Sequence, residues 1–136
     1  MQIATQLALF LENRPGTLAR VCNALAEQGI NILAVSTSDT VDHTVVRMVV
    51  SDPRKALFLF EERGTLVVES EVLLVEAPNK PGALGRIAAA LAKGKVNIDY
   101  LYCAATPSSR KGVVALRVSN PKRALGLLQE EFGKAA

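Results

Sequence analysis

Asn-Arg-Pro-Gly-Thr-Leu-Ala-Arg occupies residues 13–20, and a second string of the same pattern, Asn-Lys-Pro-Gly-Ala-Leu-Gly-Arg, occupies residues 79–86. Each string follows an apolar run and precedes apolar residues at helical spacing, namely Leu18, Val21 and Leu25 in one copy and Leu84, Ile87 and Leu91 in the other. Proline fixes φ and lacks an N–H, whereas glycine tolerates unusual backbone angles. The strings therefore predict two strand-to-helix turns, each with free helix amides that an anion could contact.

The repeat predicts two units, residues 1–68 and residues 69–136. Asp52-Pro53 and Asn120-Pro121 are helix starts, because the first side chain can accept from free amides and proline suits the first helical position. In the first unit we expect strands at about 6–12, 30–35, 43–50 and 65–68, helices that end before Gly29 and Gly64, and a polar loop at 36–42. In the second unit we expect strands at about 72–77, 96–102 and 112–118, with helices at about 82–93 and from Pro121 onward.

Both units are expected to follow the order strand, helix, strand, strand, helix, strand. Because strand-helix-strand crossovers are right-handed, the two helices of a unit should cover one face of an antiparallel sheet. Only Lys134, Ala135 and Ala136 follow Gly133, too few for a fourth strand. The predicted fold class is therefore α+β, with two ferredoxin-like βαββαβ units in tandem and the fourth strand of the second unit truncated. The bare sheet face and the unfinished edge would be open to another copy or chain.

The composition is that of a globular protein, with 49% hydrophobic and 21% charged residues. No apolar run is long enough to span a bilayer, and the N-terminus lacks the basic start of a secretory signal. The two cysteines, Cys22 and Cys103, stand at non-equivalent positions of the repeat, so we expect reduced thiols rather than a disulfide. We expect a cytoplasmic protein without a membrane partner.

Few residues could support catalysis, metal binding or base recognition. His43 is the single histidine, and no set of nucleophile, base and orienting acid can be assembled around it. No Cys-x-x-Cys pair or histidine cluster is present. The net charge of +3 and the pI of about 9.1 would suit RNA, but the predicted third strands carry no aromatic residue on which a base could stack. We expect no enzyme activity, no cofactor, no metal and no nucleic acid partner.

The two strings, followed by Gln-Gly-Ile-Asn-Ile at 28–32 and by Lys-Val-Asn-Ile at 95–98, resemble those of ACT domains over nearly the whole chain. ACT domains are small ligand-binding modules attached to many enzymes of amino-acid metabolism, and this chain looks like a stand-alone tandem of two. The resemblance implies that a free amino acid or similar small metabolite binds at an interface between two ACT units. It also implies a homodimer whose output passes through a regulated enzyme partner.

Carried over by position, the resemblance implies two ligand half-sites: Asn13, Gly16, Thr17, Leu18, Asn31 and Ile32 in one copy, and Asn79, Gly82, Ala83, Leu84, Asn97 and Ile98 in the other. A ligand carboxylate would sit on the helix amides, where the helix dipole favours negative charge. Other interpretations stay open. The turns could serve only the crossover, the asparagines Asn31 and Asn97 could be turn residues, and the chain could be a ligand-free interaction module that acts through its sheet face or open edge.

Overall fold

The computed structural model describes residues 1–40 and 42–133 and divides the chain into two compact units. One unit comprises Thr5–Ser70 and is called the 5–70 unit below. The other comprises Glu71–Ala136 together with Met1–Ala4, and is called the 71–136 unit. The predicted boundary between residues 68 and 69 lies two residues before the observed division, and the first four residues group with the second half of the chain.

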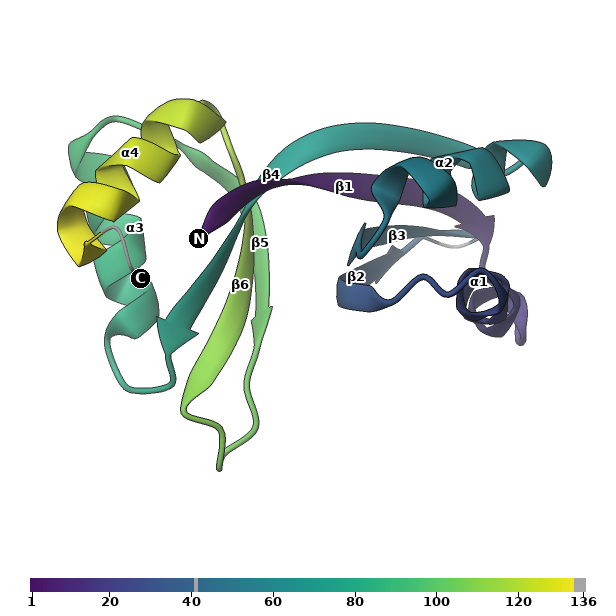
Figure 1. Cartoon of the computed structure of the whole chain (residues 1–136), viewed down its shortest axis with the longest axis horizontal. Coiled ribbons are helices and arrows are strands. Elements are labelled where there is room, and N and C mark those ends of the chain that lie inside the picture. The colour runs from purple at the N-terminus through teal and green to yellow at the C-terminus, as the bar shows by residue number, and fades with distance from the viewer. Residues whose placement is uncertain (41, 134–136) are drawn as a thin grey trace. The chain divides into compact units, whose positions relative to one another are not determined.

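The described residues form ten elements in the order β-α-β-β-α-β-α-β-β-α, which follows the order that the repeat predicts (Figure 1). The strand order in the sheet is β2-β3-β1-β4-β6-β5. Strand β3 pairs antiparallel with β1 and β2, and strand β6 pairs antiparallel with β4 and β5. The elements are β1 (Gln2–Glu12), α1 (Thr17–Glu27), β2 (Ile32–Asp39), β3 (His43–Val50), α2 (Pro53–Glu62), β4 (Leu66–Pro78), α3 (Ala83–Lys93), β5 (Ile98–Ala104), β6 (Lys111–Val118) and α4 (Pro121–Phe132).

The core of the 5–70 unit lies between its sheet and its two helices. Strand β1 contributes Leu7 and Leu9, which are fully buried, and its partner β3 contributes Met48 opposite Leu7. Helix α1 adds Leu25 and helix α2 adds Phe60 to the same apolar cluster. Both helices therefore pack on one face of the sheet, as the right-handed crossover requires.

The 71–136 unit repeats this core with Leu73 from β4, Ile87 and Leu91 from α3, Leu116 from β6 and Leu128 from α4. Met1 and Ile3 pack against the same cluster, although they begin β1 at the other end of the sequence. The start of β1 thus belongs to the 71–136 unit, for which the fourth strand was predicted to be truncated. The predicted stub at Lys134–Ala136 lies outside the described residues.

Helix boundaries follow the local chemistry of the sequence. The side chains of Asp52 and Asn120 cap α2 and α4 by accepting from the backbone N–H of Lys55 at 3.1 Å and of Arg123 at 3.2 Å. Helix α1 ends before Gly29, which has φ of +70°, and α2 ends before Gly64, which has φ of +71°. Glycine adopts this left-handed conformation without the steric cost that other residues carry.

Two strand boundaries differ from the predicted ones. The expected loop at 36–42 was wrong for its first part, because β2 continues to Asp39 and its polar residues pair with β3, for example Thr37 with Val46. The strands expected at 65–68 and 72–77, the first passing almost directly into the second, form one uninterrupted strand, β4, from Leu66 to Pro78. In both stretches backbone pairing, rather than side-chain hydrophobicity, maintains the strand.

Candidate functional site

The two Pro-Gly turns have nearly the same backbone. Gly16 has φ of 88° and ψ of −14°, and Gly82 has φ of 88° and ψ of −11°. The N–H of Thr17 donates to the carbonyl of Arg14 at 3.2 Å, and the N–H of Ala83 donates to the carbonyl of Lys80 at 3.3 Å. These bonds close each turn just before the helix begins.

No side chain caps α1 or α3. The N–H groups of the second and third helical residues therefore have no partner inside the helix, because such a partner would have to lie four residues earlier. Leu18 and Leu84, the second residues of these helices, are 42% and 40% exposed. Each turn consequently presents free amides beside an exposed leucine, an arrangement that suits the carboxylate of a small, partly apolar molecule.

Asparagine supports the second turn through a neighbouring hairpin. The side-chain amide of Asn79 donates to the carbonyls of Thr106 at 3.0 Å and Ser109 at 2.8 Å, and its backbone N–H donates to the carbonyl of Arg110 at 2.9 Å. The amide hydrogens of Asn79 are thus engaged within the protein, so this side chain can offer a ligand only its oxygen.

The asparagines before β2 and β5 form hydrogen bonds at the ends of the β2–β3 and β5–β6 strand pairs that lie away from the Pro-Gly turns. Asn31 exchanges two bonds with Ser51, donating its N–H to the hydroxyl at 2.9 Å and accepting from the Ser51 N–H at 2.8 Å. Asn97 and Ser119 make the same pair at 3.1 and 3.0 Å. The side chain of Asn97 also donates to the carboxylate of Asp99 at 2.8 Å. Both asparagines therefore have a backbone role that recurs in the repeat.

The turn and the asparagine of one half-site lie at opposite ends of one sheet. Glu12, just before the first turn, pairs with His43, whereas Ile32 pairs with Val50 at the other end of β3. At about 3.3 Å per residue this separation is roughly 20 Å along the strand. The same holds in the 71–136 unit, where Pro78 pairs with Lys111 and Ile98 pairs with Val118. No single unit brings a complete predicted half-site together.

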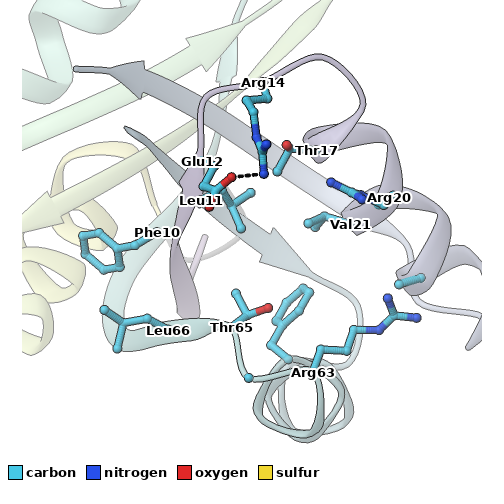
Figure 2. A pocket seen from close by; sticks show the side chains of 13 residues that line it. Phe10, Leu11, Glu12, Arg14, Thr17, Arg20, Val21, Arg63, Thr65 and Leu66 are labelled. Atoms are coloured by element: carbon cyan, nitrogen blue, oxygen red, sulfur yellow. Dashed lines mark ion pairs between the residues drawn. The ribbon is translucent and has the colours of Figure 1, made fainter. Parts of the chain in front are cut away.

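Cavities accompany both turns. A cavity of about 430 Å³ beside the second turn is lined by Asn79, Ala83 and Leu84 of the predicted half-site. A larger cavity of about 620 Å³ lies in the 5–70 unit beside the first turn, and of the predicted residues it includes only Thr17 (Figure 2). The hydroxyl oxygen of Thr17 is buried and has no hydrogen-bond partner among the described residues. An unsatisfied buried hydroxyl costs about 1–3 kcal/mol.

A family model described as "ACT domain pair" matches residues 1–132. The chain belongs to the ACT domain family. A search of curated protein sequences gave no significant match. Among solved structures, the ACT pair is similar to protein BT0572 from Bacteroides thetaiotaomicron, with 33% sequence identity and a TM-score of 0.87 over 95% of this chain and 88% of that chain.

Two further structures share the fold of this ACT pair. The ligand-free regulatory subunit of aspartate kinase from Thermus thermophilus has a TM-score of 0.72 at 21% identity, over 97% of this chain and 98% of that chain. Aspartate kinase from Synechocystis has a TM-score of 0.66 at 21% identity, over 94% of this chain and 25% of that chain. A two-unit fold of this size thus occurs both as a separate subunit and within a longer enzyme chain.

Three arginines of the larger cavity were missed by the sequence analysis of this ACT pair. Arg14 and Arg20 come from the first string, and Arg63 comes from the end of α2 (Figure 2). The first two recur in the repeat as Lys80 and Arg86, a signal that was present in the sequence. Arg63 carried no such signal, because only the fold brings the end of α2 next to the start of α1.

Other features that could support a function are few among the described residues. No helix among them is long and apolar enough to cross a membrane. Nor do the described ranges contain three His, Cys, Asp or Glu side chains grouped so that they could hold a metal ion. Cys22 and Cys103 are free thiols. The turns and their cavities are therefore the features on which a functional hypothesis can rest.

Proposed function

We propose that this ACT pair is a non-catalytic regulatory protein that binds a free amino acid, or a similar small metabolite, between ACT units. The observation that supports the proposal is the preserved geometry of the two Pro-Gly turns, each with uncapped amides next to an exposed leucine. A ligand carboxylate on these amides would interact favourably with the helix dipole. The free thiols agree with a cytoplasmic location for such a sensor.

The separation of turn and asparagine gives this proposal a geometric form. A small amino acid cannot span roughly 20 Å within one sheet, so a ligand that contacts both groups must lie where the turn of one ACT unit meets the strand start of another. A homodimer would supply such neighbours. Binding across an interface would then favour one arrangement of the units, which an enzyme partner recognises, because a ligand shifts an equilibrium by its difference in affinity for the two states.

A thermal-shift screen against the twenty amino acids, with calorimetry on the hits, tests the proposal. A true ligand at a hundred times its dissociation constant should add about 2.7 kcal/mol to the free energy of unfolding. We expect a selective increase of several degrees in Tm for one or a few chemically related amino acids. A uniform response, or none, would count against the amino-acid ligand.

Variants at the turns test the site itself. Gly16→Val and Gly82→Val place a branched side chain where a ligand would approach the backbone, and we expect them to abolish the ligand-induced shift. Gly64→Val is the matched control, because Gly64 also has a positive φ and open space around its Cβ position but lies in neither half-site. If the turn variants fold and still bind the amino acid as tightly as Gly64→Val does, the site assignment is wrong.

A ligand-free interaction module is the second candidate function. The 5–70 unit exposes Phe10, Leu66 and Val68 at 40%, 65% and 49% on strands β1 and β4. Apolar strand residues of this kind can bind a partner protein. Val68→Asp should then weaken association with that partner and leave amino-acid binding unchanged, whereas the sensor proposal expects both properties to be linked.

A further inference from the structure

The cavity beside the first turn has features that the amino-acid proposal does not use. It is an open hollow bordered by the end of β1, the first turns of α1, the end of α2 and the start of β4, all within the 5–70 unit (Figure 2). Thr17 is its only residue in common with the predicted half-sites. Its apolar part is formed by Phe10, Leu11, Val21 and Phe60. This cavity is therefore distinct from the turn amides on which the proposed function rests.

The lining is positively charged, with three arginines against one glutamate. Arg14 forms an ion pair with Glu12, which neutralises both side chains. Neither Arg20 nor Arg63 has an ion-pair partner within residues 1–40 and 42–133. Arg20 and Arg63 thus line a cavity of about 620 Å³ whose one carboxylate, Glu12, is already paired with Arg14. An anion bound between them would form charge-assisted hydrogen bonds with these two exposed arginines.

In the second copy of the repeat, the protein itself supplies a carboxylate at the equivalent position. Arg86 corresponds to Arg20, and Glu131 corresponds to Arg63 when both are counted from the helix caps Asp52 and Asn120. Arg86 Nε donates to the Glu131 carboxylate at 3.1 Å, and its Nη2 donates to the Glu131 carbonyl at 3.2 Å.

Apolar side chains also fill this place in the second copy. Phe132 stands at the position of Gly64 and lies under the Arg86 guanidinium, 4.4 Å from the ring centroid. Met1 contributes as well, and Ala83 replaces Thr17, so the remaining cavity is only about 220 Å³. In the 5–70 unit, Arg63 and Gly64 stand at the positions of Glu131 and Phe132, and no methionine lines the cavity.

We infer that the cavity of the 5–70 unit binds a small organic anion, with Arg20 and Arg63 holding a carboxylate or phosphate group and the apolar lining holding the body of the molecule. The anion takes the part that Glu131 plays in the second copy. Guanidinium groups bind both oxyanions through paired, charge-assisted hydrogen bonds. The surplus of positive charge in the lining favours a ligand with net negative charge over a zwitterion. Thr17 also lines the cavity, although its hydroxyl oxygen, which has no hydrogen-bond partner among the described residues, is buried.

Titration with four probes tests the inference and separates the two oxyanions: succinate and phenylacetate for carboxylates, inorganic phosphate and phenyl phosphate for phosphates. Binding is followed by calorimetry at constant ionic strength and by the side-chain Nε–Hε signals of Arg20 and Arg63 in NMR spectra. Saturable binding of one class, with shifts of both arginine signals, is expected. If no probe of either class saturates, or the shifts follow ionic strength alone, the inference is wrong.

Arg63→Glu is the decisive variant, because it gives the first copy the carboxylate that the second copy has. Arg20 would then pair within the protein, and the affinity for the bound probe should fall about tenfold or more, as expected when a hydrogen bond to a charged group is lost. Arg54→Glu makes the same change of charge at the other end of α2 and should leave the affinity nearly unchanged. Equal losses of affinity in both variants would show that only the net charge of the protein matters, and the assignment of the site would be wrong.

The reverse change in the second copy gives an independent readout. Glu131→Gln removes the carboxylate that neutralises Arg86 and should create weak anion binding there, detected by a shift of the Arg86 Nε–Hε signal. None of these variants touches the Pro-Gly turns. If amino acids bind and the anion probes do not, only the inference about the cavity is wrong. If the anion probes bind and amino acids do not, only the proposed function is wrong.

Discussion

Gly16 and Gly82 are the residues on which the geometry of both turns depends. Their φ of 88° lies in the left-handed region, and no atom beyond the adjacent residues lies within 4 Å of the position that a Cβ would occupy. The requirement for glycine is therefore conformational and does not come from crowding. Proline before it restricts the chain further, so the two residues together direct the first amides of the helix outward.

Gly16→Ala and Gly82→Ala should each lower the free energy of unfolding by about 1–2 kcal/mol, because an L-residue is strained in the left-handed region. Urea denaturation measures the change. Gly126→Ala is the control, since Gly126 lies inside α4 with open space around it and no positive φ. That substitution should stabilise the protein by about 0.5–1 kcal/mol. Equal effects at all three positions would contradict the conformational explanation.

Candidate site residues were predictable from the sequence only where the repeat marked them. The turns at Gly16 and Gly82 have the predicted strand-to-helix geometry, because proline and glycine determine local backbone angles. Arg63 could not be found in this way. Arg63 lines the same cavity as Arg20 because α2 packs beside α1. Its counterpart Glu131 becomes informative only through the bond to Arg86 in the folded second copy.

Helices α2 and α4 begin at equivalent caps with different chemistry. Asp52 and Asn120 each accept one bond from the third helical residue, and proline follows both caps. Helix α4 is two residues longer than α2, and its extra length carries Glu131 and Phe132 to Arg86. The start of each helix is thus common to the repeat, whereas the end of each helix determines whether its cavity is open or filled.

Asp52→Ala and Asn120→Ala should each lower the free energy of unfolding by about 1 kcal/mol through loss of the cap. Asp52→Asn should retain most of the stability, because an asparagine oxygen accepts the same bond. Thermal unfolding monitored by circular dichroism provides the measurement. Should Asp52→Asn be as destabilising as Asp52→Ala, the cap bond would not be the cause.

Element types were predicted well because their signals are local, and the errors have a common cause. Apolar periodicity and caps identify the helices and strand β3. Strand β2 extends through Ser36–Asp39 and β4 extends through Glu69–Glu71, although both stretches are polar. Neighbouring strands supply the hydrogen bonds there, and a single sequence does not reveal which strands are neighbours.

At the scale of the whole molecule, the boundary between the units does not follow the boundary between the repeats. Residues 1–4 belong to the unit of Glu71–Ala136, and Met1 and Ile3 pack on its core. The start of β1 therefore stands where the predicted structure had an unfinished edge. The repeat in the sequence cannot predict this placement of residues 1–4. In the 5–70 unit the equivalent strand is the start of β4, which follows the helices of that unit in the chain, whereas residues 1–4 precede all the helices.

Ile3→Ala should lower the stability of the 71–136 unit by about 1–2 kcal/mol, as expected for a half-buried apolar side chain, and should leave the 5–70 unit nearly unchanged. Amide hydrogen exchange measures each unit separately, at Leu91 and Leu116 in one and at Leu25 and Met48 in the other. Leu57→Ala, a half-buried residue against the core of the 5–70 unit, should give the opposite pattern. Faster exchange of both units in Ile3→Ala would argue against this division.

The packing of residues 1–4 in the 71–136 unit affects the order in which the chain can fold during synthesis on the ribosome. The 5–70 unit is contiguous, so its strands can pair as soon as they emerge. Met1 and Ile3 are synthesised well before the core that covers them, and at about 5–20 residues per second they wait for several seconds. Contacts between such distant parts of a chain form slowly. The packing of Met1 and Ile3 on the core of the 71–136 unit is therefore expected to be a late event of folding.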